Sequence, residues 1–189
     1  MIVGVVLAAG AGRRFGSPKQ LAELDGVPLL QHAIDAMLAV PALDGVVVVL
    51  GAAAEHVAAA VKFADAQPVV CRDWEEGMAA SLRCGVGAIG DADWAVVTLG
   101  DQPYVTPEAI EAVVDGLTPD APAVRAGYDG VGGHPVALSR ALFARVAELR
   151  GDAGARDMLA NVEVRMVEVG RLGRPDDIDT PEQLEAMRS

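Results

Sequence analysis

Cationic side chains and glycines alternate near the start of the sequence, within residues 10–19. The glycines are Gly10, Gly12 and Gly16, and the cations are Arg13, Arg14 and Lys19. Glycine lets the backbone approach a bound group closely and adopt conformations that other residues disfavour. This local positive charge contrasts with the formal net charge of the whole chain, which is -12. Because backbone amides and cations together hold phosphate groups, this segment predicts a phosphate-binding loop.

The spacing of these glycines matches neither of two common nucleotide motifs. Gly10 and Gly12 fit the dinucleotide fingerprint, but Phe15 occupies the place of its third glycine. The Walker pattern is excluded because the chain has no Gly-Lys pair. The glycines alone would equally suit an ordinary turn between a strand and a helix. The three neighbouring cations favour phosphate binding over that alternative.

A carboxylate at Asp101 is placed to bind a metal ion. It follows an apolar run, residues 94–99, after the single residue Gly100, and it is followed by Gln102 and Pro103. In open α/β sheets, ligands gather at the carboxyl ends of the strands, so Asp101 should lie near the glycine loop. Mg2+ prefers oxygen ligands. The alternative is that Asp101 only caps the next turn, and its pairing with a phosphate loop favours the metal.

Two further segments carry polar groups that could meet a ligand. Gly77 opens a predicted helix whose first amides are free to bind an anion or a base edge, and Ser81 adds a hydroxyl. The alternative is that Ser81 faces solvent beside ordinary core residues. Gly133 and His134 lie in a glycine-rich turn before Pro135. A lone histidine in a turn is usually structural or solvated, so proton transfer by His134 is not expected.

These residues need a scaffold, and strand-like and helix-like segments alternate along the chain. After an N-terminal strand, the predicted strands are residues 46–50, 67–71 and 94–99, and the predicted helices are residues 29–40, 53–63, 78–89 and one opened by Thr106-Pro107-Glu108. The second half adds short strands at 121–125 and 136–138, a half-exposed strand at 162–169, and a helix start at Thr180 with capping-box spacing. The pattern predicts an α/β fold with three layers, a Rossmann-like, mostly parallel sheet covered by helices on both faces.

Composition limits the class of protein. A chain of 189 residues fits one domain with a substantial core, and 52% apolar but only 4% aromatic residues make that core aliphatic. No stretch has transmembrane length, and the N-terminal apolar run lacks the basic region of a signal peptide. The acidic balance argues against a nucleic-acid partner. Cys71 and Cys84 have neither CxxC spacing nor histidine partners, so free buried thiols in a reducing cytoplasm are expected.

The loop segment resembles the signature of nucleotidyltransferases of the molybdenum cofactor type, Leu-Ala-Ala-Gly-x-Gly-x-Arg-x-Gly-x-x-Lys. The chain reads LAAGAGRRFGSPK over residues 7–19. Strict spacing from Gly16 matches the signature arginine to Arg14, whereas the free turn at Gly12 favours Arg13 as the residue that meets the phosphates. The resemblance implies a nucleoside triphosphate bound along this loop.

Four more blocks resemble family segments in the same order, at residues 74–83, 100–103, 132–136 and 177–182. The ordered set is similar to the molybdenum cofactor cytidylyltransferases and guanylyltransferases, and it implies a fold of the nucleotide-diphospho-sugar transferase type. It further implies one nucleotidyltransferase domain over residues 1–189, with a nucleotide-binding N-terminal half and an acceptor-binding C-terminal half. Many relatives carry an asparagine near the position of Cys71, so a polar contact made there is in doubt for this chain.

The resemblance also implies roles for particular residues. The nucleotide would be bound by Leu7, Ala8, Ala9, Gly10, Gly12, Arg13, Arg14, Lys19, Gly77 and Ser81. Mg2+ would be held by Asp101 and Asp179, although the acidic segment around Asp179 could equally be a solvated loop. Catalysis would depend on Arg13, Lys19 and Asp101, and the acceptor would be bound by Gly133, His134 and Arg156.

The expected reaction is the transfer of CMP from CTP to the terminal phosphate of the molybdenum cofactor's pterin, with release of pyrophosphate. Within the family Leu-Ala-Ala-Gly accompanies cytidine nucleotides and Leu-Ala-Gly-Gly guanosine nucleotides, so Ala9 implies CTP. The alternatives are a GTP-using enzyme, a sugar-phosphate or isoprenoid-precursor acceptor, and a nucleotide-binding or cofactor-carrier module without turnover. Expected partners are the triphosphate, the phosphorylated acceptor and, transiently, a molybdoenzyme or its chaperone.

Overall fold

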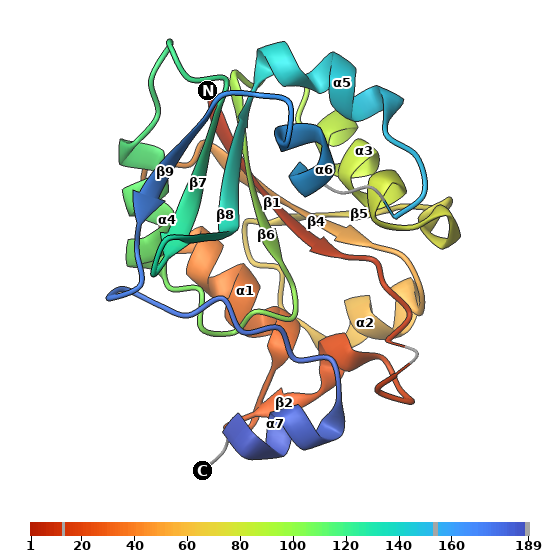
Figure 1. Ribbon diagram of the computed structural model, residues 1–189. Helices are drawn as coiled ribbons and strands as arrows, with labels where there is room; N and C mark the ends of the chain where they lie inside the picture. The colour runs from red at the N-terminus through yellow and green to blue at the C-terminus, as the bar shows by residue number, and fades with distance from the viewer. Residues whose placement is uncertain (13, 153–154, 188–189) are drawn as a thin grey trace.

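The computed structural model describes residues 1–12, 14–152 and 155–187. A mixed β-sheet forms the centre of this structure. The sheet is seven-stranded, in the order β5-β4-β1-β6-β8-β7-β9 (Figure 1). Its strands are β1 (Ile2–Ala8), β4 (Gly45–Leu50), β5 (Gln67–Val70), β6 (Trp94–Leu99), β7 (Ala123–Tyr128), β8 (Val131–Ser139) and β9 (Val164–Glu168). The central strands β1, β4 and β6 are valine-rich and buried along nearly their whole length, as expected for parallel strands covered on both faces.

The pairing of the strands is mostly parallel. β1 pairs in parallel with β4 and β6, and the pairs β4–β5 and β7–β9 are also parallel. β8 runs antiparallel to both β6 and β7. The predicted mostly parallel sheet is therefore confirmed, and the reversal at β8 accounts for the break in the alternation of the second half.

Helices cover both faces of this sheet (Figure 1). They are α1 (Leu29–Leu38), α2 (Ala54–Ala60), α3 (Met78–Ala88), α4 (Pro107–Asp115), α5 (Phe143–Glu148), α6 (Ala155–Leu159) and α7 (Pro181–Met187). On one face, residues of α1, α2 and α4 pack with Val6 and Val48, and on the other face residues of α3, α5 and α6 pack with Val5 and Val49. Alternate residues of one strand point to opposite faces, so the three-layer prediction is confirmed.

Most predicted elements are found with small shifts of their ends. α2 ends at Ala60, before the expected residue 63, and β8 is longer than the predicted strand 136–138. The elements that were not predicted are α5, α6 and the small hairpin of β2 (Glu23–Leu24) and β3 (Val27–Pro28). These elements are too short to display a helical or alternating period. The glycines of 132–133 read as a turn, but pairing with β7 draws them into β8.

Two helix starts follow their predicted caps. The Thr106 hydroxyl accepts a hydrogen bond from the Ala109 amide at 3.2 Å at the start of α4. Before α7, Thr180 and Gln183 form a capping box, in which the Gln183 amide donates to Thr180 Oγ1 at 3.3 Å and the Thr180 amide donates to Gln183 Oε1 at 3.0 Å. Each start therefore satisfies backbone donors that the helix itself leaves free.

The segment before α7 crosses the carboxyl-end edge of the sheet. Ile178 is fully buried in a small apolar cluster with Leu24, Leu29 and Leu184. The Ile178 amide also donates a hydrogen bond to the Asp101 carbonyl at 3.1 Å. This packing fixes the neighbouring carboxylates of the C-terminal segment beside the end of β6.

No helix of the described chain is long and apolar enough to cross a membrane. Both cysteines are free thiols, as predicted. Cys71 is buried, but Cys84 is partly exposed, so the prediction that both are buried is wrong for Cys84. Burial and the neighbouring Cys71 raise the pKa of the Cys84 thiol to about 11. The Cys84 thiol is therefore protonated at neutral pH and a poor nucleophile.

Candidate active site

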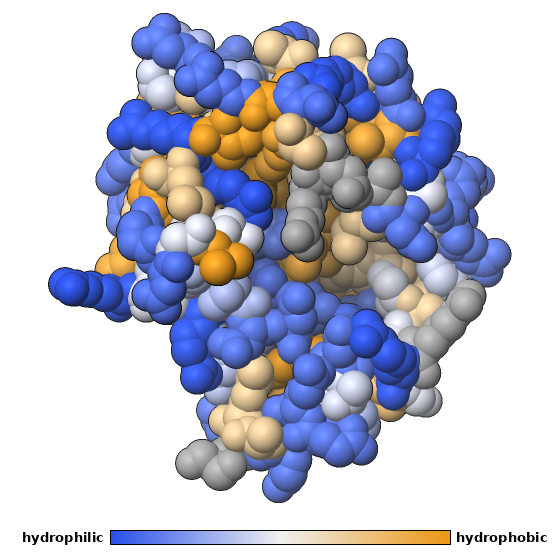
Figure 2. All heavy atoms as spheres, viewed as in Figure 1, coloured by the Kyte–Doolittle hydropathy of each residue, from blue (hydrophilic) through white to orange (hydrophobic). Residues whose placement is uncertain are grey.

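A cleft of about 530 Å³ opens at the carboxyl ends of β1 and β6. Its described lining comes from the end of β1 and the glycine loop, from the start of α3, and from the end of β6. The lining residues are Leu7, Ala8, Ala9, Gly10, Ala11, Gly12, Arg14, Lys19, Gln20, Trp74, Glu75, Gly77, Met78, Ser81, Leu99, Gly100, Asp101 and Asp152. Figure 2 shows this face hollowed next to α7, with hydrophilic side chains gathered around α7. The predicted nucleotide-binding residues thus lie together, except Arg13, which is outside the described residues.

The glycine loop makes a tight turn that depends on Gly12. The Gly12 carbonyl accepts hydrogen bonds from the amides of Phe15 and Gly16, at 2.8 and 3.2 Å. Gly12 has a φ of +60°, and a Cβ atom there would lie 2.8 Å from the Ser17 carbonyl oxygen. Only glycine fits such a position without strain. The turn leads the chain back, so that Lys19 lines the same cleft as Gly10.

Gln20, at the C-terminal end of this loop, binds the N-terminal end of the loop through its side chain. The sequence analysis did not predict this role. Gln20 Nε2 donates hydrogen bonds to the carbonyl oxygens of Ala8, at 2.8 Å, and Gly10, at 2.6 Å. The side chain is buried, with 3% of its surface exposed. A carbonyl oxygen turned toward the same two acceptors would be repelled, so the orientation of the amide is fixed. The only signal in the sequence is that Gln20 directly follows Lys19.

Replacing Gln20 with glutamate is expected to lower the free energy of unfolding by about 3 kcal/mol, because two buried donor bonds are lost and a carboxylate faces two carbonyl oxygens. Urea denaturation at pH 7.5 measures the change. Gln67→Glu on the exposed edge strand β5 is the matched control and should change stability little. Equal stability of the two variants would show that Gln20 does not hold the loop.

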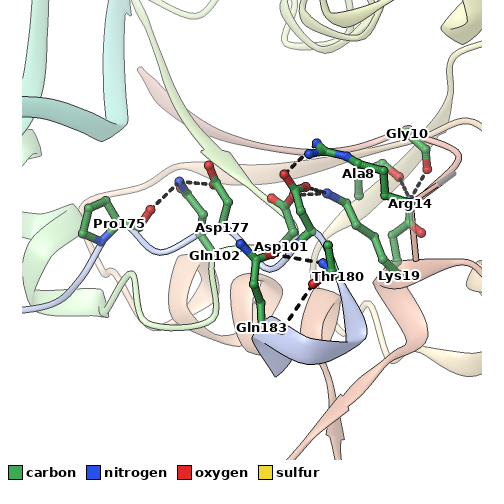
Figure 3. A network of polar contacts seen from close by, with 12 residues as sticks. Ala8, Gly10, Arg14, Lys19, Asp101, Gln102, Pro175, Asp177, Thr180 and Gln183 are labelled. Atoms are coloured by element: carbon green, nitrogen blue, oxygen red, sulfur yellow. Dashed lines mark hydrogen bonds and ion pairs between the residues drawn. The ribbon is translucent and has the colours of Figure 1, made fainter. Parts of the chain in front are cut away.

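Lys19 lies between the two carboxylates that were predicted to bind metal. Its Nζ donates to Asp101 Oδ2 and, at 2.9 Å, to Asp179 Oδ1. Arg14 Nη2 donates to the other oxygen of Asp179, Oδ2, at 2.7 Å. Figure 3 shows Lys19 pointing toward Asp101, with Arg14 reaching over the same cluster. Residues from the glycine loop, from β6 and from the segment before α7 therefore meet at one place.

A neighbouring amide organises a third carboxylate. Gln102 Nε2 donates to Asp177 Oδ1 at 2.7 Å and to the Pro175 carbonyl at 3.2 Å (Figure 3). Gln102 is buried, with 4% of its surface exposed. Neither Gln102 nor Asp177 was predicted as a site residue, although both lie inside blocks that the sequence analysis singled out.

The charges of this cluster shift the acidities of its members. Burial by itself lowers the pKa of Lys19, but the charges and hydrogen bonds of Asp101 and Asp179 outweigh burial and raise that pKa. The hydrogen bond from Lys19 holds the pKa of Asp179 below its usual range. Burial, followed by the charge of Asp101, raises the pKa of Asp177. Lys19 is therefore charged at neutral pH, and Asp179 is ionised.

Asp101 and Asp179 fit a divalent cation in charge and in ligand chemistry. Both already face one cationic group, the Nζ of Lys19, and carboxylate oxygens are the ligands that Mg2+ prefers. Within the described residues no group of three or more His, Cys, Asp and Glu side chains is arranged to hold a metal by itself. The two carboxylates would thus supply part of the ligand set, with phosphate oxygens and water supplying the rest.

The start of α3 forms the opposite wall of the cleft and depends on Gly77. This residue has a φ of +107°, and a Cβ atom there would lie 2.6 Å from the Gly151 carbonyl oxygen and would also collide with Asp152 Oδ1. The same Gly151 carbonyl accepts a hydrogen bond from the Ala79 amide at 3.1 Å. Ser81, one turn further, is buried and lines the cleft. The loop at 151–152 therefore positions the first turn of α3.

The predicted acceptor-binding residues are not in the described lining of this cleft. The register of β6 with β8, Val97 opposite Val136, places Gly133 and His134 at the same edge of the sheet as Asp101. A Cβ atom on Gly133 would meet the Tyr128 ring at 2.9 Å, so this part of β8 packs against that ring. Arg156 lies in α6, and its side chain is outside the described residues. The acceptor pocket remains a prediction.

The His134 imidazole is neutral near pH 7. Burial, followed by the charge of Arg125, lowers the pKa of His134 to about 4. The Tyr128 hydroxyl donates a hydrogen bond to the His134 carbonyl at 2.7 Å, which anchors the backbone rather than the ring.

Stability is expected to fall as the pH drops from about 6.5 toward 4, because the unfolded chain binds a proton on His134 and the folded chain does not. Protonation of His134 lowers the free energy of unfolding by at most about 1.4 kcal/mol for each pH unit. Urea denaturation from pH 7.5 to 4.5 should show a smaller loss for His134→Gln than for the wild type. His56→Gln, at an exposed site on α2, is the matched control. Parallel curves for all three proteins would contradict the prediction.

The amino-acid sequence is similar to a known domain family and to named proteins. The MobA-like NTP transferase domain matches residues 4–168. The chain is 33% identical over 194 residues to nicotine blue oxidoreductase of Paenarthrobacter nicotinovorans, covering 97% of this chain and 94% of the relative. It is also 33% identical over 199 residues to the purine catabolism protein PucB of Bacillus subtilis, with 99% and 96% covered.

Solved structures share the fold. Rv0371c of Mycobacterium tuberculosis H37Rv superposes with a TM-score of 0.86 and 32% identity over 99% of this chain and 97% of its own, and it has also been solved in complex with manganese. A nucleotidyl transferase of Methanothermobacter thermautotroptrophicus gives a TM-score of 0.82 at 25% identity, covering 100% and 96%. A CMP:2-keto-3-deoxy-manno-octonic acid synthetase complexed with CTP, 19% identical over 100% and 96% with a TM-score of 0.76, shows the fold alone.

Proposed function

The chain belongs to the MobA-like NTP transferase domain family, and we propose that it transfers CMP from CTP to the terminal phosphate of the molybdenum cofactor's pterin, with release of pyrophosphate. The observation that carries this proposal is the meeting of Lys19, Asp101 and Asp179 beside the glycine loop. Transfer of a nucleotidyl group needs positioning and neutralisation of phosphate charge more than covalent chemistry. A cleft with a glycine loop, a cation and two carboxylates supplies those needs.

Each part of the cleft has a role in this mechanism. The backbone from Leu7 to Gly10 receives the base, and the glycine loop that turns at Gly12 receives the phosphates. The acceptor phosphate attacks the α-phosphorus in line, and Lys19 with Arg13 or Arg14 neutralises the departing pyrophosphate. Mg2+ held by Asp101 and Asp179 would supply further neutralisation of the phosphate oxygens.

The choice of nucleotide and acceptor rests on the sequence. Ala9, buried at the end of β1 and lining the cleft, is the residue whose type accompanies cytidine nucleotides in the resembled family. The acceptor side would be formed by Gly133, His134 and Arg156. A neutral His134 suits a role in shaping the pocket, because an acceptor phosphate near pH 7 is already largely ionised and needs no base.

The test is a panel of the four ribonucleoside triphosphates with Mg2+ and candidate acceptors, read by pyrophosphate release. We expect release with CTP and the molybdenum cofactor, and little with GTP. Release with GTP alone would assign the guanylyl reaction, and release with a sugar phosphate or isoprenoid precursor would assign another acceptor. Binding of CTP without pyrophosphate release in any arm would indicate a nucleotide-binding or cofactor-carrier module.

The name of one relative raises a second candidate, an oxidoreductase. This chain lacks the third glycine of the dinucleotide fingerprint, where Phe15 stands, and its cleft brings together the charged groups expected for phosphate transfer. Nucleotidyl transfer is therefore favoured. Consumption of NADH or NADPH with an oxidised dye, measured beside the pyrophosphate assay, separates the two activities.

The expected setting follows from the same proposal. The free thiols of Cys71 and Cys84 suit a reducing compartment, the cytoplasm. A molybdoenzyme or its chaperone would be the transient partner that receives the product.

A further inference from the structure

We propose that Lys19 competes with the divalent cation for Asp101 and Asp179, so that metal binds tightly only together with a triphosphate that draws Lys19 away. The nucleotide part of this inference rests on the proposed function, whereas the competition concerns only side chains of this chain. Lys19 would then have two sets of partners, the carboxylates and the phosphates.

The contacts around Asp179 support competition. Its Oδ1 accepts from Lys19 at 2.9 Å and its Oδ2 accepts from Arg14 at 2.7 Å, so each oxygen already faces a cation. Asp101 Oδ2 accepts from the same Lys19 ammonium. A metal ion that binds both carboxylates must approach the oxygens that Lys19 now contacts.

The burial of the group makes this competition costly for the metal. The side chains of Lys19 and Asp101 are 17% and 16% exposed, and that of Asp179 is 29% exposed. Charges that are partly withdrawn from water interact more strongly than surface charges. Each of the two carboxylates is already paired with the Lys19 ammonium, and a divalent ion arriving alone must displace that ammonium to reach them.

A triphosphate changes that balance. It brings negative charge into the cleft and offers Lys19 new acceptors, and the four-carbon stem of lysine allows its ammonium to move between partners. Once Lys19 has turned to the phosphates, Asp101 Oδ2 and Asp179 Oδ1, the two oxygens that it contacts, are open to the metal. Metal and nucleotide should therefore raise each other's affinity, as linkage requires.

The test is binding of Mn2+ alone, without nucleotide, followed by electron paramagnetic resonance at pH 7.5. We expect Lys19→Met to bind Mn2+ at least about tenfold more tightly than the wild type, since one adjacent positive charge is removed. Lys62, the chain's other lysine, is exposed, follows α2 and is not in the described lining of the cleft. Lys62→Met makes the same change of net charge and should leave the affinity unchanged, and Lys19→Arg, which keeps a cation, should resemble the wild type.

Equal or weaker Mn2+ binding by Lys19→Met overturns the competition, as does an equal gain in Lys62→Met. Circular dichroism checks that the variants are folded, and the rise of Tm with Mn2+ provides a second measure of affinity in each. The result is independent of turnover. Tighter Mn2+ binding by Lys19→Met without pyrophosphate release by the wild type would support the competition and contradict the proposed function, and the reverse result would do the opposite.

Discussion

Replacing Asp101 with alanine is expected to reduce pyrophosphate release by about a thousandfold or more while the fold survives. The substitution removes a carboxylate that faces the Lys19 ammonium and would hold the metal, and preorganised charges of this kind contribute about 10²–10³ in rate or more. The hydrogen bond that ties the C-terminal segment to this position is donated by the Ile178 amide to the Asp101 backbone carbonyl, at 3.1 Å. That bond does not need the side chain, so the architecture should be retained.

Initial rates with CTP, Mg2+ and acceptor measure the loss, and circular dichroism and Tm measure the fold. Asp101→Asn, which preserves the shape of the side chain, should be nearly as inactive because it removes the charge. Asp65→Ala, at an exposed site outside the cleft, is the matched control and should retain full activity. Full activity in Asp101→Ala would remove this residue from the site.

Replacing Gly77 with alanine should destabilise the protein by about 2–4 kcal/mol and weaken nucleotide binding. The alanine would have to adopt the φ of +107° that Gly77 has, and its Cβ atom would lie 2.6 Å from the Gly151 carbonyl oxygen. Because that oxygen belongs to the backbone, it cannot move aside as a flexible side chain could. The first turn of α3, which lines the cleft, would have to shift.

Gly87 in the same helix provides a close comparison. It is exposed, and a Cβ atom there would meet nothing within 4 Å. Gly87→Ala should therefore be neutral or stabilising by up to about 1 kcal/mol, since alanine is the better helix former. Urea denaturation and CTP titration of both variants measure the two effects. If Gly77→Ala matched Gly87→Ala in both, the contact with the 151–152 loop would not position the cleft wall.

The family and the fold class could be predicted because their signals are local. Buried parallel strands require long apolar runs, such as residues 45–50, and the helices between them require apolar residues at helical spacing. The caps at Thr106 and Thr180 involve groups within three residues of each other. Elements shorter than a period, such as α5 and α6, left no such signal.

The sequence by itself determined which groups this protein has for chemistry: a glycine loop with cations, a carboxylate after an apolar run, and an acidic segment near residue 179. Only the tertiary structure decided which of them meet. Lys19 and Asp179 are separated by 160 residues, and they come together because Ile178 is buried in an apolar cluster that carries the C-terminal segment across the sheet edge. Likewise, the hold of Gln20 on the carbonyls of Ala8 and Gly10 depends on the path of the loop. Such pairings arise from packing between distant segments, whereas composition and spacing report only on neighbours along the chain.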